Sequence, residues 1–195
     1  MLEYNSIPFS ESTSSIEVSS STEVATGGFN DEQAQIVPVE KNKTISVSNS
    51  PVSVFDVAAY ILNKLGPIST IKLQKLVYYC QAWSLVWDEE PLFSERIEAW
   101  INGPVVRELF AFHRGVFQID SIPIGIIGHL SKKQTETIDA VIDFYGKKTG
   151  QELVEISHLE EPWKLARKGL ARDERGETEI SLESMAEYYT SISVR

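Results

Sequence analysis

The side chains best suited to nucleophilic chemistry in this sequence are a single cysteine, Cys80, and three histidines. A thiolate activated by a histidine base is a common nucleophile, so Cys80 with His113 or His158 is the candidate pair for a hydrolase. Cys80 lies between Tyr79 and Gln81 in the most apolar stretch of the chain, where a free cysteine usually serves as a small buried hydrophobe. We therefore expect no catalytic residue, and a hydrolase that uses Cys80 and His158 remains the alternative from the enzyme class.

Metal and nucleotide sites need ligands at a fixed spacing, and the sequence does not supply them. His158 lies close to Glu160 and Glu161, but no His-x-x-x-His or His-Glu-x-x-His pattern places two ligands on one helix face. We expect His158 to hydrogen-bond locally and both glutamates to face water or cap a helix. Gly125 and Gly128 lack the lysine of a phosphate loop, and Gly-x-Gly-x-x-Gly does not occur. The sequence predicts no metal and no cofactor.

The overall composition restricts the partners and the compartment. A net charge of −10 repels a phosphate backbone and attracts a basic protein. The first residues lack the basic and apolar regions of a secretory signal, and no apolar run approaches the roughly 20 residues of a membrane-spanning helix. One cysteine excludes an intramolecular disulfide. We expect a soluble cytoplasmic protein that binds neither nucleic acid nor membrane.

Two parts of unequal character follow from the composition along the chain. Residues 1–50 contain eleven serines and four threonines, with seven acidic residues against two lysines. Low hydrophobicity combined with net charge predicts a disordered tail there, and residues 51–195 are the expected folded domain. The tail is either a segment that binds a partner or an ordinary flexible leader.

The folded part is predicted to be mainly α. Ser131 with Gln134 and Thr149 with Glu152 have the spacing of capping boxes, and the most apolar helix is expected to lie at the centre. A partial alternation over residues 91–104 indicates a small β-hairpin. The expected fold is a compact bundle of about seven short helices, over residues 54–65, 70–87, 105–113, 131–145, 149–158, 161–168 and 181–191.

Aromatic residues are concentrated on and around the predicted central helix. Tyr79, Trp83 and Trp87 repeat every four residues and form one stripe, and Trp100 and Trp163 lie elsewhere in the chain. Such residues either fill a core or, where they face solvent, dominate the binding energy of protein interfaces. Both interpretations stay open for each aromatic.

A series of short motifs gives a family resemblance. They are Ala-Tyr-Ile-Leu at 59–62, Thr-Ile-Lys-Leu-Gln-Lys-Leu-Val-Tyr-Tyr at 70–79, Gln-Ala-Trp at 81–83, Pro-Leu-Phe at 91–93, Glu-Ala-Trp at 98–100, Gly-Pro-Val at 103–105, Ser-His at 157–158 and Pro-Trp at 162–163. In this order they resemble the Panacea domain, the family that includes SocA-like antitoxins and phage-associated proteins. The resemblance covers residues 54–189, nearly the whole predicted domain.

The resemblance implies an antitoxin that binds and neutralises a cognate protein toxin. It also implies an alternative, a proteolytic adaptor that delivers a toxin to a Clp-type protease. Polar side chains on an otherwise apolar helix need either solvent or a partner, which singles out Lys72, Gln74 and Lys75. The expected partner-binding residues are Lys72, Gln74, Lys75, Tyr79, Trp83, Trp100, Gly103, Pro104 and Trp163.

Overall fold

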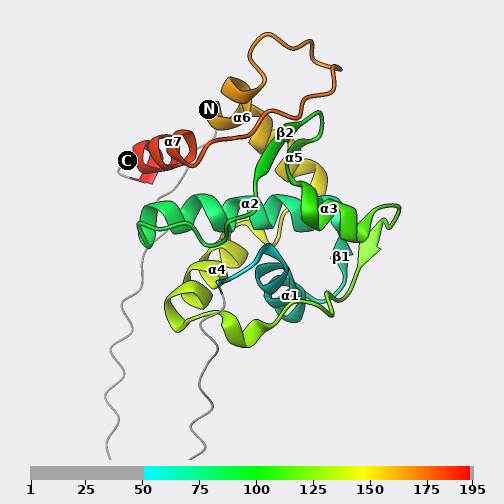
Figure 1. Ribbon diagram of the computed structural model, residues 1–195, viewed down its shortest axis with the longest axis vertical. Coiled ribbons are helices and arrows are strands. Elements are labelled where there is room, and N and C mark those ends of the chain that lie inside the picture. The colour runs from blue at the N-terminus through cyan, green and yellow to red at the C-terminus, as the bar shows by residue number, and fades with distance from the viewer. Residues whose placement is uncertain (1–50, 194–195) are drawn as a thin grey trace, which may run out of the picture. The chain divides into compact units, whose positions relative to one another are not determined.

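The computed structural model describes residues 51–193, so the predicted tail at residues 1–50 lies outside the described residues. The described part is mainly α with short strands, as the sequence predicted (Figure 1). Its elements are α1 (Val54–Leu65), β1 (Ile68–Ser69), α2 (Thr70–Trp87), β2 (Ile97–Trp100), β3 (Gly103–Val106), α3 (Arg107–His113), β4 (Gln118–Ile119), the 3-10 helix η1 (Ile127–His129), α4 (Lys132–Tyr145), α5 (Gly150–Leu159), α6 (Glu161–Ala166) and α7 (Leu182–Ser193).

Helix α2 is the centre of the fold, as its apolar sequence predicted. It packs against α1, α4, α5, α7 and β3 (Figure 1), and every residue from Leu73 to Ser84 is buried. Because neighbours surround the helix, its polar side chains must find hydrogen-bond partners inside the protein. Among the described helices, none has both the length and the apolar character needed to span a membrane.

Local capping signals define several helix starts. The Ser131 side chain accepts from the Gln134 backbone while the Gln134 side chain accepts from the Ser131 backbone, and Thr149 with Glu152 forms the same reciprocal pair. Each box satisfies backbone N–H groups that the first turn of a helix leaves without partners. Both predicted capping boxes are confirmed.

The predicted β-hairpin is present, but its second strand ends later in the sequence than predicted. Strands β2 and β3 pair antiparallel from Ile97 opposite Val106 to Trp100 opposite Gly103. Val105 and Val106 therefore belong to a strand, and the prediction that a helix begins at residue 105 is wrong because α3 begins at Arg107. On its other side, β2 is joined by the chain before α7, where Ala99 N–H donates to the Thr178 carbonyl at 2.8 Å.

The long connection between α3 and α4 is fixed to α1. The Asp56 carboxylate accepts from the Ile126 backbone at 2.6 Å and lies 3.3 Å from His129 Nδ1. Burial raises the pKa of Asp56, but the hydrogen bonds from the Ile126 and Ser53 backbones outweigh it and the net pKa is lowered. A side chain at Gly125 would collide with the Phe55 carbonyl oxygen, so glycine lets the loop lie directly on α1.

Candidate functional site

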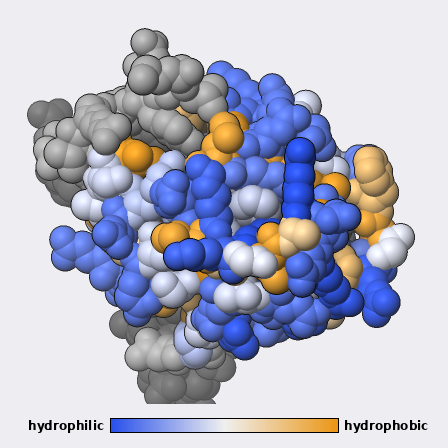
Figure 2. All heavy atoms as spheres, turned by 90° about the horizontal axis from the view of Figure 1, so that it is seen from above, coloured by the Kyte–Doolittle hydropathy of each residue, from blue (hydrophilic) through white to orange (hydrophobic). Residues whose placement is uncertain are grey.

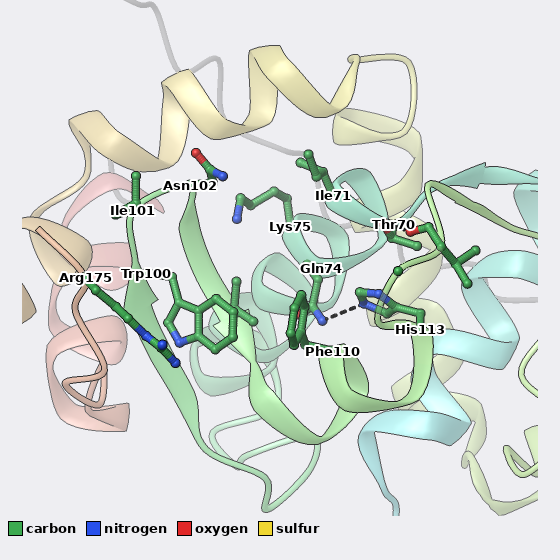
Figure 3. Close-up of a pocket in the computed structure, with 13 residues that line it drawn as sticks. Thr70, Ile71, Gln74, Lys75, Trp100, Ile101, Asn102, Phe110, His113 and Arg175 are labelled. Carbon is green, nitrogen blue, oxygen red and sulfur yellow. Dashed lines mark hydrogen bonds between the residues drawn. The ribbon is translucent and has the colours of Figure 1, made fainter. Parts of the chain in front are cut away.

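A pocket of about 350 Å³ opens where α2, the β2–β3 hairpin and α3 meet (Figure 3). Ile71 of α2, Trp100 of β2 and Phe110 of α3 form apolar walls, and Lys75 and Arg175 bring positive charge. Arg175 reaches the pocket from the chain before α7, which runs beside β2. The site thus combines an apolar cavity with cationic groups, the composition of a binding pocket rather than a filled core.

Lys75 is the buried cation of the pocket. Its side chain is only 1% exposed, and its Nζ donates to the Pro104 carbonyl at 2.8 Å. Burial lowers the pKa of Lys75 to about 7, because a charged amine loses its hydration there. Among the described residues, no carboxylate forms an ion pair with Lys75.

Gly103 makes the close approach of the hairpin to Lys75 feasible. Its φ is +92°, and a Cβ at this position would lie 2.8 Å from both Lys75 Cε and Ser157 Oγ. Glycine alone combines this backbone conformation with the absence of a side chain. The predicted residues Lys75, Gly103 and Pro104 are therefore brought together beside the pocket.

Gln74 binds the hairpin rather than solvent. Its side-chain oxygen accepts from the Val106 backbone at 2.9 Å, and its Nε2 donates to the Val106 carbonyl at 3.3 Å. The same nitrogen lies 3.0 Å from His113 Nε2, which must be the acceptor because an amide nitrogen only donates. Burial lowers the pKa of His113, which agrees with a neutral ring in this contact.

Lys72, on the next turn towards the N-terminus of α2, is held at a different place. Its Nζ donates to the Gly146 carbonyl at the end of α4, at 2.6 Å. Burial lowers the pKa of Lys72, and the side chain is not part of the pocket wall. The three polar residues that the sequence singled out on α2 all have partners inside the protein.

Tyr79 and Trp83 lie in the core, with exposed fractions of 0% and 4%. The Tyr79 ring stacks on Tyr145 at 4.0 Å between centroids, and Trp83 Nε1 donates to the Tyr145 hydroxyl at 3.4 Å. In this arrangement neither side chain offers a surface to a partner, so burial favours the core interpretation of this stripe.

Trp100 and Trp163 link the hairpin to α6. Trp163 Nε1 donates to the Trp100 carbonyl at 3.0 Å, and its ring stacks on His158 at 4.0 Å. The Trp100 indole donates to Glu98 at 2.7 Å, a carboxylate that Arg107 also binds with two nitrogens. Both indoles are half-buried; Trp100 presents its ring to the pocket (Figure 3).

Glu160 is a core residue that sequence reasoning missed. Its side chain has no exposed surface and accepts from the Tyr189 hydroxyl at 2.8 Å and from the Tyr79 hydroxyl at 3.4 Å. The expectation that Glu160 faces water or caps α6 is wrong, because tyrosines from α2 and α7 supply its hydrogen bonds. Glu161 is exposed, as expected.

The candidate nucleophile is placed where it cannot easily ionise. Cys80 is buried and free, and burial raises the pKa of its thiol far above the ordinary value. Burial also lowers the pKa of His158, to which the charge of Lys75 adds. A buried thiol of raised pKa is inert rather than reactive. Within residues 51–193, no group of His, Cys, Asp and Glu side chains has the arrangement of a metal site.

The rim of the pocket carries exposed apolar side chains that the sequence analysis did not single out. Ile71, Ile101 and Val116 line the pocket and are 41%, 38% and 48% exposed; Phe117 follows Val116 and is 78% exposed. We call these four residues the pocket rim. On the face shown in Figure 2, small groups of apolar side chains lie between hydrophilic ones.

The comparison with known families adds to this geometry. Residues 73–164 match the family described as Antitoxin SocA-like, Panacea domain. The match includes Lys75, the β2–β3 hairpin and Trp163, and it begins one residue after Lys72. No curated protein and no solved structure matches the chain. Residues 73–164 are therefore similar to the Panacea domain of the antitoxin SocA-like family, which agrees with the resemblance that the motifs predicted.

Proposed function

We propose that this chain is a cytoplasmic antitoxin that neutralises a cognate protein toxin by direct, non-covalent binding. The observation that carries the proposal is the family match over residues 73–164, which includes most of the residues that line the pocket but not Thr70, Ile71 and Arg175. The chemistry of the described residues agrees with a role as a binding protein rather than an enzyme, because Cys80 is buried with a raised pKa.

We assign the toxin contact to the pocket and its rim. Exposed apolar residues beside a half-buried tryptophan and an arginine have the composition of an interface hot spot. The rest of the chain contributes by its charge, since −10 overall speeds encounter with a basic toxin. This charge effect predicts a slower association rate at high salt, where screening weakens attraction between separated charges.

Co-expression tests the function. The product of the gene beside this one is produced in cells alone and together with this chain, and growth and complex formation are followed. The proposal expects the neighbouring product to arrest growth alone and the chain to restore growth while copurifying with it. A neighbour that is harmless alone, or that stays equally toxic without forming a complex, contradicts the proposal.

The adaptor alternative rests on the resemblance, and the same strains test it. Delivery to a Clp-type protease predicts that the half-life of the toxin falls when this chain is present and recovers when the protease is absent. Removing residues 1–50 would then preserve toxin binding and abolish degradation if the tail engages the protease. If the chain restores growth while the half-life of the toxin is unchanged, the adaptor alternative is excluded and neutralisation by binding is supported.

A further inference from the structure

The Lys75 ammonium group has unused hydrogen-bonding capacity at the pocket. An ammonium group has three N–H donors, and the hydrogen bond of Lys75 goes to the Pro104 carbonyl. Figure 3 shows the amine end of Lys75 directed into the pocket between Asn102 and Trp100. A buried ammonium group without a carboxylate partner is costly, so an anion entering this pocket would gain a strong partner.

Lys75 is the basic group of the pocket lining that has no carboxylate partner among the described residues. Arg175 lines the same pocket from the chain before α7, but it also pairs with Glu177 at 2.7 Å. Burial lowers the pKa of His113 in the lining and of His158 on α5, so both histidines tend towards the neutral form. The pocket lining contains no aspartate or glutamate, although the chain has 28 acidic residues against 18 basic ones. An unpaired lysine in a pocket of an acidic protein favours a negatively charged group.

The walls and the volume require more than a small anion. Ile71, Trp100 and Phe110 offer apolar surface around a cavity of about 350 Å³, so an inorganic ion would leave most of this surface in contact with water. Apolar walls contribute binding energy only when an apolar group covers them. The guest must therefore carry an apolar body and a negative charge close together.

A C-terminal residue of a protein meets both requirements within one residue. Its free carboxylate and its side chain diverge from the same Cα, and its chain leaves the pocket in one direction only. An internal Asp or Glu would instead offer the apolar walls only a short methylene stem, and two chain segments would have to pass through the mouth of the pocket. The binding function proposed above supplies a protein partner to which such an end belongs.

We propose that the pocket binds the C-terminal residue of the partner toxin, with an apolar side chain against Ile71, Trp100 and Phe110 and the free carboxylate against Lys75. The specificity is for an apolar residue with a free terminal carboxylate. This inference rests on the proposed function for the identity of the partner and on the pocket alone for the chemistry of the site.

Matched pairs of small compounds test the site without the toxin. N-acetyl-leucine and N-acetyl-phenylalanine reproduce a C-terminal residue, and their primary amides lack the charge. Calorimetry on the full chain measures all four. The free acids are expected to bind with a Kd on the order of 1 mM, because a ligand this small makes few contacts. The amides should bind at least about tenfold more weakly.

Two variants assign the preference to the pocket. Lys75→Met keeps a long side chain in the same place and should bring the ratio of acid to amide affinity close to one. Lys72→Met removes a lysine of the same helix that lies outside the pocket and donates to Gly146, so the ratio should stay at the value of the unmodified protein. Circular dichroism melting of both variants establishes that they are folded.

The proposed site is wrong if the acids and the amides bind with equal affinity, or if neither binds at tens of millimolar. It is also wrong if the preference for acids over amides survives in Lys75→Met or is lost in Lys72→Met. The outcome is separable from that of the proposed function. If the chain binds the free acids but forms no complex with the toxin, the carboxylate site stands and the proposed function fails. If it forms the complex but does not bind the acids, the proposed function stands and the site fails.

Discussion

The Lys75 ammonium group lies 2.8 Å from the carbonyl oxygen of Pro104, so a cation of the central helix is held against the turn end of the hairpin that covers it. The sequence separates the two residues by 29 positions. Helix α2 and the hairpin share this contact beside the pocket, and the burial of Lys75 there lowers its pKa.

Replacing Lys75 by methionine should stabilise the protein, and more so at low pH. The pKa of Lys75 is about 7 in the folded protein and ordinarily 10.5, so the unfolded chain binds more protons between these values. The stability of the unmodified protein therefore rises with pH through this window. Below pH 7 the folded protein carries the full cost of a buried charge.

Urea unfolding at pH 6 and pH 9 measures this linkage. The gain in unfolding free energy from Lys75→Met should be larger at pH 6 than at pH 9 by about 2 kcal/mol. Lys72→Met provides the comparison, because burial lowers the pKa of Lys72 less and its side chain is half-exposed. A Lys75→Met gain that is the same at both pH values would show that Lys75 is not the buried titrating group.

Binding of the free acids should weaken as the pH rises above 7. A bound carboxylate favours the charged form of Lys75, whose pKa is about 7, so the amine must take up a proton to bind well at pH 9. His113 and His158, with pKa values lowered by burial, and Arg175 with its partner Glu177 are charged or titratable groups of the same region. Protonation of either histidine at low pH would also strengthen the binding of the free acids.

Calorimetry with N-acetyl-leucine at pH 6 and pH 9 should give a fall in affinity of about tenfold or more. The amide lacks the charge, and its affinity should be nearly independent of pH. Repeating the titration with His113→Gln and His158→Gln separates the contributions of the two histidines to the pH dependence from that of Lys75. If the pH effect persists in Lys75→Met, then Lys75 is not its origin.

Gln81 should be one of the most sensitive polar positions of the core. Its side chain is 1% exposed, accepts from the backbones of Leu92 and Phe93 at 2.9 and 3.1 Å, and donates to the Phe93 carbonyl at 3.0 Å. Gln81→Leu leaves these buried backbone groups without partners. The expected loss of unfolding free energy is about 3 kcal/mol, measured by urea denaturation.

Gln151→Leu is the matched control, because Gln151 is exposed on α5 and its side chain donates to the nearby Glu155 side chain at 3.1 Å. It should change stability by less than about 0.5 kcal/mol. Similar losses in the two variants would argue against a structural role for the Gln81 contacts.

Gly103→Ala should damage both the fold and the pocket. The positive φ of +92° and the collision with Lys75 Cε act together, at a cost of about 2 kcal/mol. Because the added methyl group displaces Lys75, the preference for free acids over amides should also fall. Gly128→Ala is the control, since a Cβ there meets nothing within 4 Å. A Gly103→Ala protein with unchanged melting and acid preference would contradict this packing.

Local signals explain which parts of the fold the sequence predicted. The capping boxes at Ser131 and Thr149 involve residues three positions apart, and the apolar character of α2 is contained in α2 itself. The start of α3 was placed too early because Val105 and Val106 are held as a strand by β2 and by Gln74. These partners are distant in the sequence.

The sequence singled out Gln74, Lys75 and Trp100 of the pocket lining as partner-binding residues, but it did not indicate the other lining residues or the geometry of the pocket. Lys75 and Gln74 were recognised as polar groups in need of partners, but their partners are backbone atoms of Pro104 and Val106, 29 and 32 positions away. The prediction for Glu160 is wrong for the same reason, because its carboxylate accepts a hydrogen bond from Tyr189, which is 29 positions away. No periodicity indicates which distant groups a buried polar side chain will meet.

Direct binding between purified proteins tests the central claim most directly. The affinity of the chain for the neighbouring gene product is measured with Ile101→Ser and Leu182→Ser, two exposed apolar positions that are both 38% exposed. Ile101 belongs to the pocket rim, and Leu182 lies on α7. We expect a tight complex whose affinity falls about tenfold or more in Ile101→Ser and is unchanged in Leu182→Ser. No complex, or equal effects of the two substitutions, would contradict it.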